Sequence, residues 1–303
     1  MKQSSREPLV AGIFYPAGER ELKELIEERA EALESPESGA AHETIPELTG
    51  LVLPHAAYEC ILPLLLEGFN LLRVKDRSPT TIILAAGLHR EKRSGIFLPP
   101  FSSFSSPLGE VKVETDSIMK IQETVEESCT EELPYLEEHS FEVLLPLISH
   151  YFPRASVVPI LTGDNEKKSI TAFSKALKLL ENREGENSRT ALMVSSNITG
   201  ETDRKNAELQ KKAFFTALKG VSTEDNGTAD NGDGTADSGS RAAEFERLLS
   251  AGRITACGAA ALAGLMRNCP TLSAVPLRTG TSRRGDEARE VIYGTIALAK
   301  GAL

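Results

Sequence analysis

Three side chains that can bind a transition metal stand at the ends of predicted strands and helices. His55 directly follows a short apolar strand at residues 51–54, and His89 follows a strand at 80–87 that is rich in β-branched residues. Cys257 opens an apolar helix, whose dipole stabilises a thiolate. Two imidazoles and one thiolate suit iron(II), copper or zinc, and they leave positions open for water or substrate. These three residues are therefore candidate metal ligands.

The same three residues also have a simpler interpretation. A histidine after a strand is often a hydrogen-bonded loop residue, and a cysteine before a glycine is often small buried filler. The five histidines show neither the H-x-x-x-H nor the H-E-x-x-H spacing of common metal sites. The Walker, G-x-G-x-x-G and G-x-S-x-G motifs are absent as well. Spacing alone therefore leaves both interpretations open.

Predicted strands alternate with predicted helices along most of the chain. The strands are expected at residues 51–54, 80–87, 95–99, 156–161, 191–195 and 291–298. The helices are expected at residues 19–34, 58–73, 116–128, 141–151, 166–182, 204–219, 242–250 and 258–267. This alternation predicts an α/β fold, a single domain whose largely parallel central sheet carries helices on both faces.

Ligands of an open parallel sheet bind beyond the carboxyl ends of its strands. Besides the two histidines, Ser196 and Asn197 follow the strand at 191–195. The segment 138–140, Glu-His-Ser, precedes the helix expected at 141–151, and its serine is the predicted N-cap of that helix. Polar groups that can bind a metal or transfer a proton are therefore expected to meet at one edge of the sheet.

The composition limits the classes of function. The net charge of −10 and the pI near 5.2 argue against broad nucleic-acid binding and against binding to anionic membranes. No apolar run reaches the roughly 18 residues of a membrane-spanning helix, and the first residues lack an apolar signal core. Four cysteines without a C-x-x-C pair are typical of a reduced protein. We therefore expect a cytoplasmic protein whose partner is a small molecule or a peptide.

One acidic segment differs in composition from the rest of the expected domain, which spans residues 6–303. Residues 222–240 contain five acidic residues and no lysine or arginine, so half of the net charge of −10 lies there. Such a low-complexity segment cannot bury enough apolar area to fold with the core. The D-x-[DN]-x-[DN]-G spacing of a calcium loop is absent, which argues against calcium binding. We expect this insert to be dispensable for folding.

Short motifs occur in a fixed order from Arg6 to the C-terminal strand. They are Arg6-x-Pro8, Phe14-Tyr15-Pro16, Pro54-His55-Ala56 with Tyr58, Pro107-Leu108-Gly109, Glu138-His139-Ser140-x-Glu142, Val158-Pro159-Ile160, Ser195-Ser196, Cys257-Gly258 and Val291-x-Tyr293. In this order they resemble the Memo family, whose microbial members are called AmmeMemoRadiSam system protein B. The resemblance implies a fold similar to the catalytic subunit of class III extradiol dioxygenases. It also implies that His55, His89 and Cys257 are the metal ligands.

Two departures from the family pattern affect the expected activity. The family has S-S-D-x-x-H after its late strand, whereas this chain has Asn197 in place of the aspartate and Gly200 in place of the histidine. That histidine resembles the general base of the dioxygenases, so extradiol ring cleavage is not expected. The sequence leaves other enzymatic activity open.

Two functional hypotheses follow. In the first, His55, His89 and Cys257 hold iron or copper, with zinc less favoured, and the protein has a redox or oxygenase-like activity in which His139 is the catalytic, proton-transferring group. In the second, the chain is a non-catalytic, degenerate Memo-fold protein whose cleft binds a peptide or a small anionic ligand. The intact ligand set favours the first hypothesis, and the two replacements favour the second.

Overall fold

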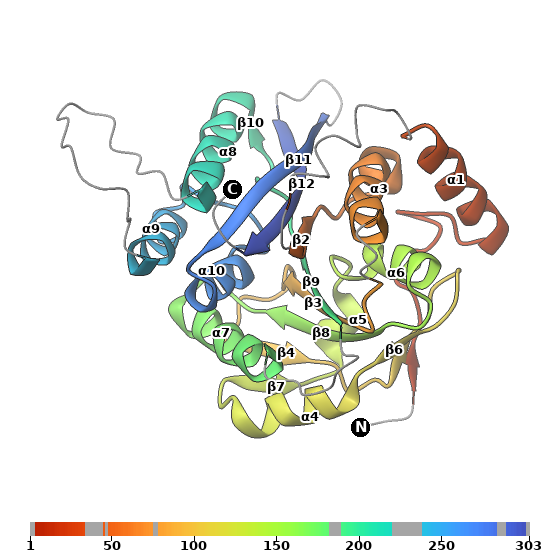
Figure 1. Cartoon of the computed structure of the whole chain (residues 1–303), viewed down its shortest axis with the longest axis horizontal. Helices are drawn as coiled ribbons and strands as arrows, with labels where there is room; N and C mark the ends of the chain where they lie inside the picture. The colour runs from red at the N-terminus through yellow and green to blue at the C-terminus, as the bar shows by residue number, and fades with distance from the viewer. Residues whose placement is uncertain are drawn as a thin grey trace.

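The computed structural model describes residues 4–33, 45, 48–74, 78–181, 189–219, 238–283 and 289–300. Within these residues a 12-stranded mixed sheet runs through the centre of the molecule, and helices lie against both of its faces (Figure 1). The predicted α/β fold is confirmed. Of the acidic insert, residues 222–237 lie outside the described residues, and the last three residues begin the helix α9 (Ser238–Ser250).

The centre of the sheet is parallel. Five strands lie side by side in the order β6 (Val111–Val113), β8 (Ser156–Thr162), β3 (Thr81–Gly87), β9 (Thr190–Ser195) and β2 (Leu48–Leu53), and each neighbouring pair is parallel. A parallel strand that is covered on both faces has to be apolar throughout. All seven residues of β3 are accordingly buried. The carboxyl ends of β2, β9 and β3 therefore lie together at one edge of the sheet.

Two long antiparallel strands and several short strands complete the sheet. They are β12 (Arg289–Lys300), β11 (Leu272–Arg283) and β10 (Thr202–Asp203) on the side of β2, and β5 (Ser103–Phe104), β1 (Ser5–Arg6), β4 (Ile96–Leu98) and β7 (Ser128–Thr130) on the side of β8. The sequence predicts β12 but not its antiparallel partner β11. Pro276 lies inside β11, and a register shift between Pro276 and Arg278 interrupts the alternation of its side chains.

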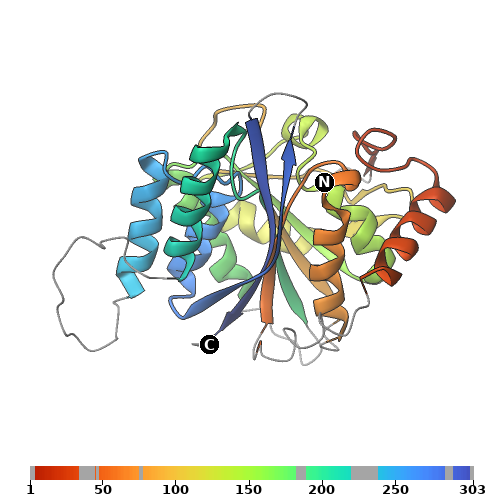
Figure 2. The same ribbon diagram turned by 90° about the horizontal axis from the view of Figure 1, so that it is seen from above.

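Two groups of helices cover the two faces of the sheet (Figure 1, Figure 2). One group consists of α3 (Tyr58–Val74) and α6 (Leu145–Tyr151), with α1 (Glu19–Glu31) packed outside α3; the other consists of α7 (Lys167–Glu181), α8 (Arg204–Lys219), α10 (Ala259–Asn268) and α9. The first eight residues of α10 are all buried, because this helix packs between the sheet, α7 and α9. None of the helices in the described ranges is both long and apolar enough to cross a bilayer.

The helix predicted at residues 141–151 differs from the observed structure. A 3-10 turn, η1 (Glu142–Leu144), comes first, and α6 begins at Leu145, so that Pro146 occupies the first turn of the helix, where proline is tolerated. Ser140 does not cap this helix, because its hydroxyl donates to the carbonyl oxygen of Gly87 at 3.3 Å. The prediction that Ser140 is the N-cap is therefore wrong.

The helix predicted at residues 116–128 is shorter than expected. The helix α4 (Thr115–Thr124) ends four residues earlier, and Ser128–Thr130 forms β7, which pairs with β4. The short helix α5 (Leu133–Glu137) follows and leads directly into the segment 138–140. This connection places that segment beside the carboxyl end of β3, to which Ser140 is hydrogen bonded.

Candidate metal centre

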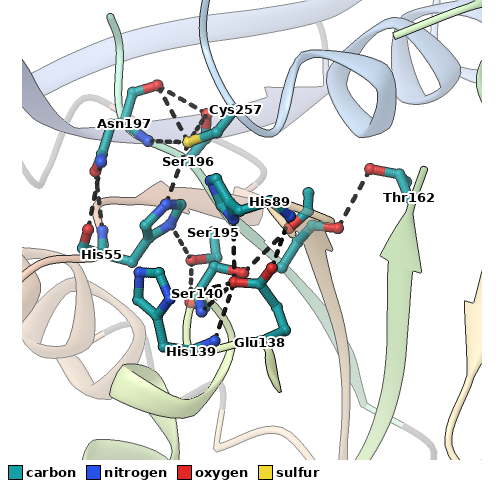
Figure 3. A network of polar contacts seen from close by, with 12 residues as sticks. His55, His89, Glu138, His139, Ser140, Thr162, Ser195, Ser196, Asn197 and Cys257 are labelled. Atoms are coloured by element: carbon teal, nitrogen blue, oxygen red, sulfur yellow. Dashed lines mark hydrogen bonds and ion pairs between the residues drawn. The ribbon is translucent and has the colours of Figure 1, made fainter. Parts of the chain in front are cut away.

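The three predicted ligands lie together at one edge of the sheet (Figure 3). The candidate donor atoms of His55, His89 and Cys257 all lie within 4.8 Å of one another. The Nε2 atom of His55 is 3.3 Å from the Sγ atom of Cys257, although the two residues are 202 positions apart in the chain. The ring centroids of the two histidines are 5.1 Å apart. The convergence that the strand ends predict is therefore present, and coordination of a metal stays a prediction.

Parallel pairing brings the two histidines to the same place. Both β2 and β3 pair with β9, so the loops that follow β2 and β3 carry His55 and His89 to either side of the end of β9. Cys257 arrives from the turn before α10 through a close backbone approach to β3. A Cβ atom on Gly87 would lie only 2.1 Å from the carbonyl oxygen of Cys257. Glycine at the end of β3 is therefore what allows the cysteine to reach this edge.

His55 is held at its backbone and at its ring. Its side chain is buried, and Nδ1 lies 2.9 Å from the hydroxyl of Ser195. Its backbone N–H donates to Oδ1 of Asn197 at 3.0 Å, and Nδ2 of Asn197 donates to its carbonyl oxygen at 3.3 Å. An aspartate at position 197 would accept the first of these bonds and could not donate the second. Asn197 therefore matches both backbone groups of His55.

His89 is held by the buried carboxylate of Glu138. Its Nδ1 lies 3.0 Å from Oε1 of Glu138, and its backbone N–H donates to Oε2 at 2.8 Å. The same Oε1 accepts the backbone N–H groups of His139 and Ser140 at 3.0 and 2.9 Å. Burial raises the pKa of Glu138, but the bond and charge interaction with His89 and these N–H groups outweigh it and lower that pKa to about 2. Glu138 is thus a carboxylate at neutral pH.

The Cys257 sulfur accepts a hydrogen bond from the residues that follow β9. The backbone N–H of Asn197 donates to Sγ at 3.0 Å, and the hydroxyl of Ser196 lies 3.8 Å from it. The N–H of Gly258 donates to the Ser196 hydroxyl at 2.9 Å, which joins the turn before α10 to the end of β9. A sulfur that accepts N–H groups at the start of a helix is stabilised as the thiolate.

Cys257 and His89 shift the pKa values of each other in opposite directions. Burial raises the pKa of Cys257, but the interactions with His55 and His89 outweigh burial and hold this pKa well below its usual value. Burial lowers the pKa of His89, but Cys257 and Glu138 outweigh burial and raise this pKa to about 10. In the metal-free centre these interactions therefore favour the thiolate of Cys257 and the protonated imidazole of His89.

His139, the predicted catalytic residue, lies next to the three ligands but outside their set. Its ring centroid is 5.8 Å from that of His55, 5.6 Å from that of His89 and 5.2 Å from that of Phe14. Its Nδ1 lies 3.5 Å from Oε1 of Glu138. Burial lowers the pKa of His139 to about 4, and the charge of Glu138, which acts in the opposite direction, does not compensate. The imidazole is therefore neutral at pH 7, and its catalytic role stays a prediction.

Gly200 contributes no side chain at the position where the family has a histidine. Its N–H donates to the hydroxyl of Thr255 at 3.0 Å. A Cβ atom on Gly200 would meet only atoms of Thr255, at 3.7 Å or more, which is ordinary van der Waals contact. A residue with a side chain could therefore be accommodated at position 200. With glycine there, no imidazole extends from this position to the centre.

A buried ion pair stabilises the segment that holds His89. Its two residues occur in the sequence motifs, but nothing in those motifs indicates that they pair. Arg6 and Glu142 form a fully buried ion pair. Arg6 also donates to the carbonyl oxygens of Tyr135 at 3.0 Å and Glu138 at 3.2 Å. The pair thus connects the N-terminal segment to Glu138, the residue that holds the imidazole of His89. The order of charged residues in the sequence does not predict this ion pair, because its partners are 136 positions apart.

A cavity of about 610 Å³ lies beside the centre, between the segment 12–18, α1 and the start of α3. Its wall includes Phe14, the ring that contacts His139, but none of the three candidate ligands. Phe14 therefore contacts both the cavity and His139.

The donor set fits a transition metal. Each candidate ligand has an outer partner that orients it: Ser195 for His55, Glu138 for His89 and the Asn197 N–H for Cys257. Within the described part of the chain, no fourth histidine, cysteine or carboxylate joins this group. Three protein ligands leave coordination positions for water or substrate, as catalytic metal sites do.

Fold and site together define an α/β protein with a candidate two-histidine, one-cysteine metal centre at the carboxyl edge of its sheet. The family model of the Memo-like proteins matches residues 6–272, so the chain belongs to the Memo-like protein family. The family resemblance of the sequence motifs is thereby confirmed.

Two MEMO1 family proteins and one solved structure are similar to this chain. A MEMO1 family protein of Nitrosopumilus maritimus is 24% identical over 96% of this chain and 98% of its own length. Another, from Methanocaldococcus jannaschii, is 28% identical over 64% of this chain and 69% of its own. The crystal structure of an uncharacterized protein from Escherichia coli K12 covers 82% of this chain and 99% of its own, with a TM-score of 0.48 and 10% identity.

Proposed function

We propose that this chain binds a transition metal, iron or copper, through His55, His89 and Cys257. The observation that supports this most directly is the approach of three donor atoms to within 4.8 Å, each from a different segment and each with an orienting partner. The mixed imidazole and thiolate set suits these metals. When bound, such an ion supplies a redox-active, Lewis-acidic centre with open coordination positions.

The residues around the centre would support proton transfer rather than ring cleavage. His139 is neutral at pH 7, lies within 6 Å of both histidine rings by centroid distance, and can accept or return a proton at a ring nitrogen. Asn197 is engaged with the backbone of His55, and Gly200 offers no base. A redox or oxygenase-like activity that relies on His139 is therefore the activity we propose.

A second candidate function is a non-catalytic binding protein for a peptide or a small anionic ligand. The observation that favours it is the pair Asn197 and Gly200, which removes the family acid and base from the edge of the centre. In this case the chain would not need to bind a metal, and His139 would have no chemical role.

Metal analysis separates these functions at their first step. The chain is purified without oxygen, reconstituted with Fe²⁺ or Cu²⁺, and its bound metal is measured by elemental analysis beside Cys257→Ser and His55→Ala. Cys60→Ser and His150→Ala are matched controls, because Cys60 is exposed on α3 and the ring of His150 contacts Tyr151 instead. We expect about one metal ion per chain in the parent and both controls, and loss of most of it in both ligand variants. A parent without metal after reconstitution contradicts the proposal.

A further inference from the structure

The orientation of His55 depends on one buried hydroxyl group. Ser195 is fully buried at the end of β9, and its Oγ lies 2.9 Å from Nδ1 of His55 and 2.5 Å from the carbonyl oxygen of Ser140 (Figure 3). A hydroxyl has one proton to donate, and a carbonyl oxygen can only accept one. The Ser195 hydroxyl therefore donates to Ser140 and accepts the Nδ1–H of His55.

We propose that Ser195 is a positioning residue that keeps a proton on Nδ1 of His55 and so reserves Nε2 for the metal. This inference rests on the proposed metal binding. Nε2 is the ring nitrogen on the ligand side, 3.3 Å from the sulfur of Cys257. The hydrogen bond made by the outer nitrogen of a metal-binding histidine selects its tautomer and fixes the ring. Here a serine hydroxyl, itself held by a backbone carbonyl, supplies that bond.

The same short segment also supports the second histidine. The carbonyl oxygen of Ser140 holds the Ser195 hydroxyl, and the N–H of Ser140 donates to Oε1 of Glu138 at 2.9 Å. That carboxylate oxygen lies 3.0 Å from Nδ1 of His89. The segment 138–140 thus supports the outer nitrogens of both imidazoles, one through a carboxylate and one through Ser195. Any shift of this segment changes both ligands together.

The position of the proton can be measured in the metal-free protein with Ser195→Ala. Ser149→Ala is the matched control, because Ser149 is also a buried serine that donates to a carbonyl oxygen, that of Leu108 at 2.8 Å. Nitrogen-15 NMR of the imidazole, assigned by comparison with His55→Ala, reports which nitrogen is protonated. We expect a protonated Nδ1 in the parent and the control, and a large share of molecules protonated only on Nε2 in Ser195→Ala. A bare Nδ1 in the parent, or an unchanged proton position in Ser195→Ala, overturns the proposal.

Titration with Co²⁺ measures the consequence for binding. Loss of such an outer partner lowers metal affinity about 10–100-fold, and we expect this loss in Ser195→Ala but not in Ser149→Ala. Thermal midpoints of both metal-free variants should fall, and by more in Ser195→Ala, because Ser195 makes two buried hydrogen bonds and Ser149 makes one. Equal Co²⁺ affinity in the parent and Ser195→Ala overturns the inference. A parent that binds no Co²⁺ contradicts the proposed function instead, and the NMR result then still decides where the proton lies.

Discussion

We expect substitution of the buried residue Glu142 to lower the free energy of unfolding of this protein strongly. Glu142 pairs with the buried guanidinium of Arg6. Its two oxygens also accept the backbone N–H groups of Leu9 at 2.9 Å and Val10 at 2.7 Å, and the hydroxyl of Tyr15 at 2.9 Å. Glu142→Gln keeps the size of the side chain but replaces one acceptor oxygen by a donor. It also leaves the charge of Arg6 buried without a counter-charge.

The expected loss of stability follows from these contacts. Removing one partner of a buried ion pair costs about 3–5 kcal/mol in free energy of unfolding. Since each kcal/mol lowers the thermal midpoint of a chain of about 300 residues by about 1.5–2 °C, we expect a fall of about 5–10 °C. Glu127→Gln is the control, because Glu127 pairs with the exposed Lys175 at 3.2 Å. Such a surface pair contributes less than about 1 kcal/mol.

Urea unfolding of the metal-free variants, followed by circular dichroism, measures both losses. Hydrogen exchange adds a local measurement, because Leu9 and Val10 donate to different oxygens of Glu142 and only one of these oxygens remains in Glu142→Gln. The amide that loses its acceptor should exchange faster than in the control. If Glu142→Gln costs no more than Glu127→Gln, the reasoning that Arg6 depends on this carboxylate is refuted.

Two further predictions concern the metal centre. Because Cys257 and Glu138, opposed by burial, raise the pKa of His89 to about 10, the metal-free protein must release the His89 proton when metal binds at neutral pH. Affinity for Co²⁺ should therefore rise by about tenfold per pH unit between pH 7 and 9 and level off near the pKa; a flat profile in a titration series contradicts this. Gly87→Ala would put a Cβ atom 2.1 Å from the carbonyl oxygen of Cys257, so the cysteine has to move. We expect loss of Co²⁺ binding in that variant while Gly280→Ala, whose Cβ would lie 3.5 Å from the nearest atom, keeps it; equal binding by both would show that the close approach does not matter.

The sequence predicts the candidate ligands of the site. It does not predict the residues that orient those ligands. His55 and His89 follow strands whose apolar, β-branched residues mark them as buried, and the ends of parallel strands meet at one edge. Glu138 and Ser195 carry no local sign of their roles, because their partners lie 49 and 140 positions away. Ser140 has the residue type of a helix cap, and its hydrogen bond to Gly87 overrides that local preference.

By itself the sequence determined the local elements, through hydrophobic periodicity, and the identity of the donor atoms, through residue type. It also determined family membership, because motifs in a fixed order persist where overall identity is low. Only the tertiary structure decided that β2 and β3 lie on either side of β9, that β11 joins β12, and that Cys257 reaches the same edge. These are long-range contacts, selected by packing and backbone hydrogen bonding over the whole sheet, and no local pattern of side chains encodes them.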